Sequence, residues 1–359
     1  MRLRSRAIRP FLRIDRIVDA QKVNHGQKPG YLWYTTLMKE FTITKNDAGQ
    51  RLDRFVTKAV PLLPSSLAQK YIRKKRIKVN GKRADGRQLL LEGDVIALYI
   101  NDEFFQTPDR ENAYLTVTRP ALTIVYEDEN LLLVDKPPGL LCHSAGGDPR
   151  DTLLSHVRAY LYQKGDWQPG QSHTFAPALC NRIDRNTGGL VIAAKNAPAL
   201  QILNEKIRTR EIDKDYLCLV HGRPHPAAGT LTGFLTKDAG KNKVSVGSGP
   251  APDAKAAVTR YRVLDARNGL SLLECRILTG RSHQIRAQLA GLGHPLLGDI
   301  KYGGPAINRP YGETAQALRA FRLTFRFETD AGALAYLTGR TVTVSSVDFV
   351  EKYGFHIDF

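Results

Sequence analysis

The stretch that most constrains the fold is a polar loop that runs directly into a buried strand. It begins Asn181-Arg182-Ile183-Asp184-Arg185 and passes through a Thr-Gly-Gly turn at 187–189 into the apolar run 190–194. A turn of this composition before a short β-branched run predicts a loop followed by a buried strand. Asp184 is the carboxylate of this loop, and it lies between two arginines.

The position of Asp184 allows two interpretations. An acid in such a loop is most often a solvated turn residue or a helix N-cap. The flanking cations Arg182 and Arg185, however, favour the ionised form of a carboxyl group, which suits a nucleophile or a charge anchor. Catalytic groups are also enriched on loops that a rigid scaffold holds. The segment alone leaves both interpretations open.

Composition limits the class of protein. The chain has 359 residues, of which 42% are hydrophobic, so it can bury a sizeable core in two or three domains. Its longest apolar runs have the length of strands and fall far short of the roughly 18 residues of a membrane helix. The four cysteines are widely separated, which argues against a zinc site and favours a reducing, cytoplasmic setting.

The formal net charge of +18 points to a polyanionic partner, most simply nucleic acid. The charge is concentrated between Arg51 and Arg87, where twelve Lys and Arg residues stand against two Asp residues. This region predicts two helices and a small sheet with a hairpin turn at Asn80-Gly81, and Ser65 or Ser66 is the expected cap of the second helix. A basic surface on this unit fits an RNA backbone, and a merely solvated basic helix is the alternative.

The remainder of the chain alternates many strands with a few helices, including helices at 197–208 and 283–292. This pattern predicts an α+β fold with a mainly antiparallel mixed sheet. The chain is expected to contain four segments: a disordered N-terminal extension at 1–37, a basic domain suited to RNA binding at 38–101, a polar linker at 102–121 and a larger α+β domain at 122–359. Met38 resembles a natural start that opens a strand, and our hypothesis is that residues 1–37 are an upstream extension of the reading frame.

Two further segments carry candidate functional groups. In Thr279-Gly280-Arg281-Ser282-His283-Gln284-Ile285-Arg286, several polar side chains surround an expected helix start. On that helix Ile285 and Leu289 would face the core, so Arg286 lies at the edge of the apolar face and its guanidinium could reach an interior acid. An ordinary capped surface helix is the alternative. Tyr216 lies in an apolar strand, where a core position is the usual role and the hydroxyl needs one partner.

These pieces together resemble a known family. Residues 49–100 resemble an S4 RNA-binding domain, and the chain from about 49 to 350 resembles the RluA-type pseudouridine synthases. The matching motifs are 126–128 with Lys136-Pro137-Pro138-Gly139-Leu140, then 182–190, then 214–216 with Gly222, and then 279–290 with 293–299 and 302–303. Asn181 stands where a His is commoner in the family, and Gly188 where a Ser is commoner.

The resemblance implies a function and a role for each matching residue. Asp184 would be the essential catalytic aspartate, Tyr216 would stack on a flipped uracil and help remove its C5 proton, and Arg286 would pair with Asp184. The expected RNA-binding residues are Arg182, Arg51, Arg73, Lys74, Lys75, Arg76, Lys78 and Arg281. The reaction would need no metal and no cofactor, since it is an isomerisation without net redox change.

The expected substrate is therefore a structured RNA, with ribosomal RNA of the large subunit as the first candidate and transfer RNA as the second. We expect a monomer without membrane association. The competing hypothesis is a non-catalytic RNA-binding or ribosome-assembly factor that retains the fold. The presence of Asp184, Tyr216 and Arg286 argues against it.

Overall fold

The computed structural model describes residues 38–100, 102–105, 109–144, 151–169, 172–238, 243–247, 249 and 253–357. The predicted disordered extension at 1–37 lies outside the described residues. Among the helices of the described part, none is long and apolar enough to cross a membrane.

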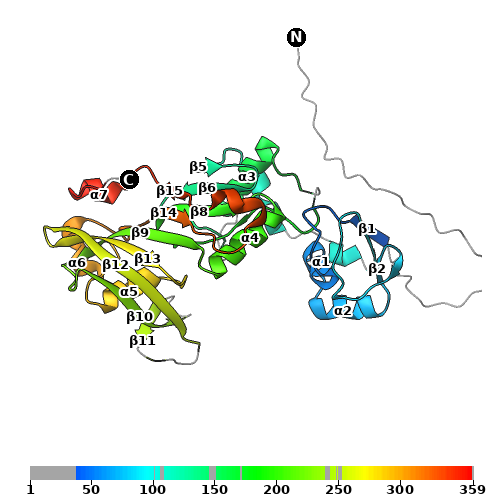
Figure 1. Cartoon of the computed structure of the whole chain (residues 1–359), viewed down its shortest axis with the longest axis horizontal. Helices are drawn as coiled ribbons and strands as arrows, with labels where there is room; N and C mark the ends of the chain where they lie inside the picture. Colours follow the sequence, from blue (N-terminus) through cyan, green and yellow to red (C-terminus); the bar gives the residue numbers. More distant parts are fainter. Residues whose placement is uncertain are drawn as a thin grey trace, which may run out of the picture. The chain divides into compact units, whose positions relative to one another are not determined.

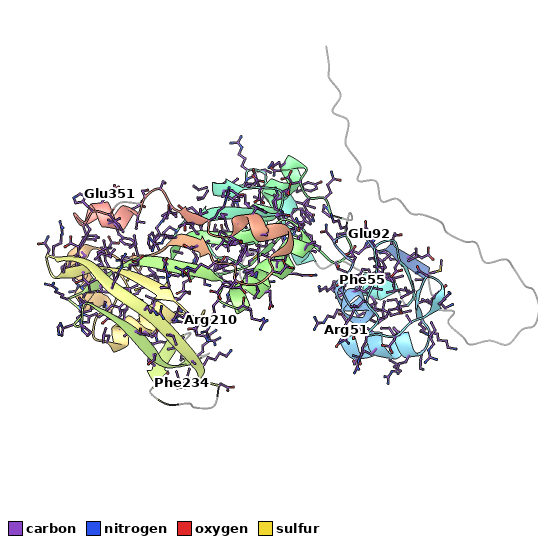
Figure 2. The ribbon with its side chains drawn as sticks, in the orientation of Figure 1. Arg51, Phe55, Glu92, Arg210, Phe234 and Glu351 are labelled. Atoms are coloured by element: carbon purple, nitrogen blue, oxygen red, sulfur yellow. The ribbon has the colours of Figure 1, made fainter. Side chains whose placement is uncertain are left out.

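The basic unit near the N-terminus is built as the sequence predicts, from two helices and a small sheet (Figure 1). Its elements are β1 (Met38–Thr42), α1 (Leu52–Ala59), α2 (Ser65–Arg73), β2 (Ile77–Val79), β3 (Lys82–Arg83) and β4 (Val95–Tyr99), and the strands pair in the order β1-β4-β2-β3. The core includes the fully buried Phe55 of α1 (Figure 2). Asn80 and Gly81 both have positive φ, at 49° and 72°, as the predicted two-residue hairpin turn between β2 and β3 requires.

The start of α2 differs from the prediction. Neither Ser65 nor Ser66 caps it, because the helix begins at Ser65 and the preceding Pro64 occupies the N-cap position without a side-chain hydrogen bond. The carbonyl of Pro64 accepts hydrogen bonds of 2.9 Å from the amides of Leu67 and Ala68. The proline ring restricts φ, here to −59°, and this value lets the chain enter the helix without a hydroxyl cap.

The second and larger part of the chain is built on one mixed sheet. Within the described residues, its main path has the order β11-β10-β12-β13-β9-β14-β8-β6-β5, with β15 on β14 and β7 on β8. All described pairings are antiparallel except the one between β14 and β8. The expectation of a mainly antiparallel mixed sheet is therefore confirmed. The strands are β5 (Thr123–Glu127), β6 (Leu131–Lys136), β7 (Ala178–Leu179), β8 (Gly188–Ala194), β9 (Ile212–His221), β10 (Ala228–Asp238), β11 (Lys243–Gly247), β12 (Lys255–Arg267), β13 (Leu270–Ile277), β14 (Leu318–Phe325) and β15 (Thr341–Thr343).

Each face of this sheet carries its own core. On one face pack α3 (Leu153–Lys164) and α5 (Gln284–Gly291), and on the other pack α4 (Ala197–Arg208), η4 (Gly332–Leu337) and α7 (Asp348–Lys352). The remaining short helices are α6 (Pro305–Asn308) and η3 (Arg309–Tyr311). Every residue of β8 is buried, as the sequence predicts for the strand after the Asp184 loop. That loop is therefore attached to the most enclosed part of the sheet.

The segment predicted as a polar linker also has short helices and a buried aromatic side chain. It contains η1 (Asp102–Phe105) and η2 (Asp109–Thr116), and Tyr114 is 4% exposed. The Tyr114 ring lies 5.0 Å from that of Trp167, centroid to centroid, in the core beneath α3. Part of this segment thus packs against the larger part of the chain, because burial of the Tyr114 ring removes a large apolar area from water.

Candidate active site

The backbone on both sides of Asp184 is held by groups from another loop. Cys142 Sγ donates a long hydrogen bond of 3.5 Å to the carbonyl of Ile183. The carbonyl of Arg185 accepts a hydrogen bond from the amide of Gly139 at 2.9 Å, and the carbonyl of Gly139 accepts one from Arg185 Nε at 2.9 Å. These contacts fix the loop at the residue before and the residue after Asp184.

Lys136 at the end of β6 makes a second set of hydrogen bonds that hold this loop, and we call this set the Lys136 clamp. Its fully buried ammonium group donates to the carbonyls of Pro137, Leu140 and Arg185 at 2.9, 2.8 and 3.0 Å. Three acceptors use all three N–H donors of a protonated lysine. Burial lowers the pKa of Lys136 to about 8, so it still carries its proton at neutral pH. The motif around Lys136 therefore organises the Asp184 loop, a role that we did not predict.

The side chain of Asp184 pairs with an arginine from far along the chain. Arg286 Nη1 lies 3.0 Å from Asp184 Oδ2, while Nε and Nη2 of the same guanidinium bond both oxygens of Asp299 at 2.7 and 3.0 Å. Arg286 is 7% exposed and Asp299 1% exposed. The bidentate contact with Asp299 fixes the plane of the guanidinium, which directs Nη1 at Asp184.

The helix that carries Arg286 is α5, and its location follows the predicted pattern. Ile285 and Leu289 are buried against the sheet, so the next position along the helix, Arg286, reaches across the edge of that face. Asp299 lies beyond the helix in the predicted motif 293–299. The resemblance included that motif, but we assigned no role to Asp299, because the sequence does not show that this loop approaches Arg286.

His283 precedes α5 and closes another side of the site. Its Nε2 lies 3.9 Å from Asp184 Oδ2, and its Nδ1 is 2.9 Å from the hydroxyl of Tyr302. That hydroxyl also accepts from the amide of Val244 at 2.9 Å, which ties β11 to the site. Burial lowers the pKa of His283, so the ring is neutral at neutral pH and is not an ion-pair partner of Asp184.

Tyr216 lies on β9 in the core beneath the Asp184 loop, together with Ile183 and Ile285. It is 6% exposed, and its hydroxyl has no hydrogen-bond partner among the described residues. The expected core position is confirmed, whereas the expected partner for the hydroxyl is not found there. Burial raises the pKa of Tyr216, and the nearby charge of Asp184 acts in the same direction, so the phenol is neutral. The hydroxyl is thus free to contact a substrate.

The arginines that flank Asp184 in sequence are not its partners. Arg182 and Arg185 are both exposed, and Arg185 bonds the carbonyl of Gly139. Neither of them forms an ion pair with Asp184 among the described residues, whereas Arg286 does so from α5. Arg281 is also exposed and donates to the carbonyl of Ala256 at 3.1 Å. RNA binding by Arg182 and Arg281 stays a prediction.

The predicted RNA-binding cations of the N-terminal unit gather at the end of α2 and on β2. Arg73, Lys74, Lys75 and Arg76 are exposed and Lys78 is half-buried, whereas Arg51 pairs with Asp53. Their exposure leaves the charges accessible to a polyanion, and their role stays a prediction. Among the described residues, no group of His, Cys, Asp and Glu has an arrangement that could hold a metal ion.

The two departures from the family pattern have local explanations. Asn181 accepts from the amide of Ile192 at 2.8 Å and so braces the loop against β8. At Gly188, a Cβ atom would lie 2.7 Å from Nη1 of Arg319, whose Nη2 pairs with Asp135 at 2.6 Å. The missing side chain at position 188 therefore leaves room for the guanidinium of Arg319.

Comparison with known proteins agrees with this architecture. Residues 130–291 match the RNA pseudouridylate synthase family and residues 50–96 match the S4 domain. An uncharacterized RNA pseudouridine synthase from Mycoplasma genitalium is 32% identical over 293 residues, which cover 80% of this chain and 90% of the relative. The ribosomal large subunit pseudouridine synthase D of Escherichia coli (strain K12) is 33% identical over 264 residues, 73% of this chain and 76% of the relative.

A solved structure supports the fold. Human RNA Pseudouridylate Synthase Domain Containing 4 superimposes with a TM-score of 0.51 at 21% identity and covers 70% of this chain and 98% of its own. The fold and the relatives together define this protein as an RNA pseudouridine synthase, an isomerase of uridine in RNA. Within that class the chain belongs to the RluA-type family with an S4 domain before the catalytic domain.

Proposed function

We propose that this protein converts specific uridines to pseudouridine in ribosomal RNA of the large subunit, with Asp184, Tyr216 and Arg286 as the reacting and positioning groups. The substrate proposal rests on the 33% identity to a ribosomal large subunit pseudouridine synthase over most of both chains. The charge of +18 fits a large polyanionic substrate.

The reaction that the site must perform is a balanced isomerisation. The N1–C1′ bond of the uridine breaks, the uracil turns, and a C5–C1′ bond forms. The proton at C5 then leaves, and N1 takes up a proton from solvent. A base inside a helix is out of reach of such a site, so the nucleotide must be flipped out of its stack.

Asp184 is proposed to assist the cleavage of the N1–C1′ bond. Its pairing with Arg286 at 3.0 Å holds the carboxylate in one orientation, and a quarter of its side chain (26%) remains exposed toward a ligand. Direct attack at C1′ and assistance of an elimination both fit this geometry. The observation that carries the proposal is the Asp184–Arg286–Asp299 chain, because it presents an oriented and accessible carboxylate.

Tyr216 and Arg182 are proposed to handle the flipped nucleotide. The ring of Tyr216 offers a surface on which uracil can stack, and its unpaired hydroxyl can take part in removal of the C5 proton. The exposed Arg182 next to the loop can occupy the gap that the flipped base leaves in the RNA. Tyr216→Phe keeps the ring and removes the hydroxyl, so it should retain RNA binding and lose turnover.

Release of tritium from RNA labelled at uridine C5 tests the proposal. We expect wild type to release tritium from large-subunit ribosomal RNA and Asp184→Ala to release none above background. Glu92→Ala, which removes an exposed carboxylate of the S4 unit, is the matched control and should behave as wild type. No release by wild type from that RNA would refute the substrate, and equal release by Asp184→Ala would refute the role of Asp184.

The monomeric state and the cytoplasmic location stay predictions from the sequence. Light scattering on the purified protein tests the first. A dimer mass at micromolar concentration would contradict it.

A further inference from the structure

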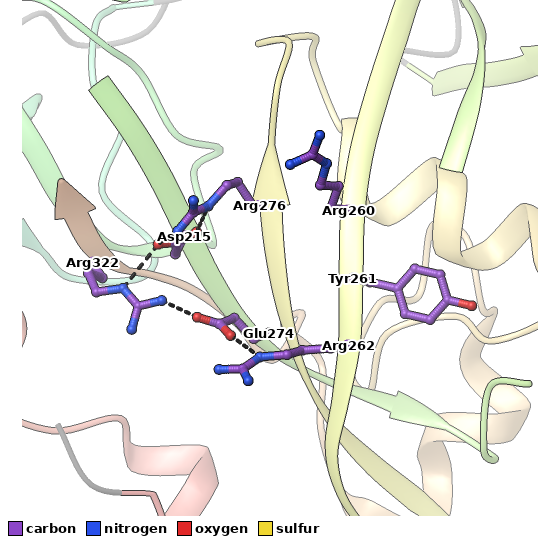
Figure 3. A pocket seen from close by; sticks show the side chains of 7 residues that line it. All are labelled: Asp215, Arg260, Tyr261, Arg262, Glu274, Arg276 and Arg322. Carbon is purple, nitrogen blue, oxygen red and sulfur yellow. Dashed lines mark hydrogen bonds and ion pairs between the residues drawn. The ribbon is translucent and has the colours of Figure 1, made fainter. Parts of the chain in front are cut away.

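A group of arginines lies on the sheet face opposite Tyr216, on which α4, η4 and α7 also pack. We call it the arginine face, and its members are Arg260 and Arg262 of β12, Arg276 of β13, Arg322 of β14 and the adjoining Arg326. Successive side chains of a strand point to opposite faces. Tyr261 and Cys275 share a core with Tyr216, so their neighbours Arg262 and Arg276 lie on the other face. Figure 3 shows Tyr261 pointing away from the arginines.

Acidic side chains between the arginines hold them in place. Asp215, 1% exposed, accepts from Arg276 Nε at 2.6 Å and from Arg322 Nε at 3.0 Å. Asp213 lies 2.8 Å from both Arg276 and Arg326. Glu274 pairs with Arg262 and Arg322 (Figure 3). The carboxylates thus fix the guanidinium groups before any ligand arrives.

The arginines of this face outnumber the carboxylates that pair with them. Among the described residues, five arginines face three carboxylates, which leaves two positive charges in excess. Arg260 has no side-chain partner among the described residues, and Arg262 uses only Nε there while its side chain stays 63% exposed. The guanidinium of Arg260 and the terminal nitrogens of Arg262 therefore remain available to a ligand.

The arginine face also contains a pocket. A pocket of about 320 Å³ is lined by Asp215, Arg260, Tyr261, Arg262, Glu274, Arg276 and Arg322 (Figure 3). Side chains of Arg276 and Arg322 are 27% and 28% exposed there. Guanidinium groups bind phosphate through parallel N–H donors, and an oriented set with excess charge is a phosphate-binding arrangement.

We propose that the arginine face binds backbone phosphates of the substrate RNA, at a segment away from the uridine that reacts. It lies on the side of the sheet away from Tyr216, so a flipped nucleotide at Asp184 and a phosphate here must come from different parts of a folded RNA. RNA is favoured over an acidic protein segment because the chain belongs to a family that acts on RNA. The inference rests on the proposed action on a large RNA.

Direct binding of large-subunit ribosomal RNA at several salt concentrations tests this proposal. The variant is Arg260→Gln with Arg262→Gln, since Arg260 has no ion pair among the described residues and Glu274 still pairs with Arg322. Loss of two phosphate contacts should reduce the slope of log affinity against log salt by about 1.5 and weaken binding several-fold at 0.1 M salt. The matched control, Arg208→Gln with Lys352→Gln, removes two exposed cations from α4 and α7 and should match wild type.

An affinity and a salt slope equal to those of wild type would overturn the proposal. Arg260→Gln alone, which breaks no ion pair among the described residues, keeps the test valid if the double variant unfolds, and its expected slope change is about half as large. The tritium assay on wild type separates this inference from the proposed function. Weakened RNA binding by the variant supports the arginine face even if wild type modifies a different RNA.

Discussion

Arg286 uses one edge of its guanidinium for Asp299 and another nitrogen for Asp184. Because Asp299 is 1% exposed and neutralises the buried arginine, it determines where Arg286 Nη1 points. Asp299 is thus a positioning residue that acts through Arg286. Removing one partner of a buried, hydrogen-bonded charge pair typically costs about 3–5 kcal/mol of stability.

Asp299→Asn separates this positioning role from simple loss of stability. We expect kcat to fall about 10²-fold, because a misplacement of about 1 Å in a reacting group has that effect, while the Kd for RNA stays unchanged. Tritium release under saturating RNA and direct RNA binding measure the two quantities at a temperature below the unfolding transition of the variant. Glu313→Gln, which weakens a surface pair with Lys352, is the control. A normal kcat in Asp299→Asn would contradict the role.

The partners of Asp184 show how far sequence reasoning extends at this scale. Arg286 was within reach because helical spacing puts it at the edge of the face that Ile285 and Leu289 define. Lys136 and Asp299 were not, because their roles depend on which loops meet in space and a sequence does not give those distances. The flanking arginines were misleading for the same reason, since neighbours in a loop need not face each other.

The pH dependence of activity should report the clamp by Lys136. Its pKa, lowered by burial to about 8, means that the ammonium loses a proton above that pH. A neutral amine has two N–H donors for three carbonyls, so the hold on the carbonyl of Arg185 weakens. We therefore expect kcat to decline as pH rises through about 8. A kcat that stays constant up to pH 9.5 would contradict the clamp.

The free energy of unfolding should also depend on the protonation of Lys136, but it should rise with pH where kcat falls. Because the folded pKa lies below that of the unfolded chain, the unfolded state binds more protons between about pH 8 and 10.5. The contribution of Lys136 to the free energy of unfolding therefore rises with pH in that window, by at most about 1.4 kcal/mol per pH unit. The difference between wild type and Lys136→Met in denaturant unfolding measures it. Equal slopes for both proteins would refute the assignment.

At the scale of elements, the site depends on the parallel contact between β8 and β14. Gly189 lies in that contact with φ of 115°, and a Cβ atom there would be 2.1 Å from the carbonyl oxygen of Ala320. The Thr-Gly-Gly turn is therefore needed for close approach of two backbones as well as for its turn. This pairing connects the Asp184 loop to β9, since β14 also pairs with the strand of Tyr216.

Gly189→Ala should accordingly separate these strands. We expect a loss of more than about 3 kcal/mol of unfolding free energy, because the added methyl meets backbone that cannot rotate away and the φ is strained for alanine. Thermal or urea unfolding measures the loss. Gly280→Ala, where a Cβ atom would meet nothing within 4 Å, is the control and should change stability by less than about 0.5 kcal/mol. Equal unfolding free energies of the two variants would show that β8 and β14 can separate without loss of stability.

Most elements were predictable because periodicity and breakers determine them locally. The helix at 197–208 and the hairpin at 80–81 occur as predicted, and the expected helix at 283–292 is α5. The N-cap of α2 was placed one or two positions too late, since Pro64 occupies the position where a serine was expected. The order of the strands was not predictable, because β14 joins β8 to β9 through contacts between residues at least a hundred positions apart.

At the scale of the whole molecule, positive charge is distributed over separate surfaces. The exposed Lys74, Lys75 and Arg76 follow α2 in the S4 unit, where the helix C-terminus favours cations. The arginine face belongs to the large sheet and holds its cations with acids. Exposed and unpaired lysines suit contact with RNA phosphates in many registers, whereas fixed guanidinium groups suit one defined segment.

Replacement of Lys74, Lys75 and Arg76 by Ala should therefore weaken RNA binding generally. If each cation contacts one phosphate, the slope of log affinity against log salt should fall by roughly 2 to 3, whatever the sequence of the RNA. Fluorescence anisotropy with two unrelated structured RNAs measures the slopes, and Arg208→Gln, Arg210→Gln and Lys352→Gln together form a control of equal charge loss. Because all three replaced side chains are exposed, the unfolding free energy should change little. A slope equal to that of the control would mean that the end of α2 does not anchor RNA, and the remaining cations of the S4 unit would then have to supply its affinity.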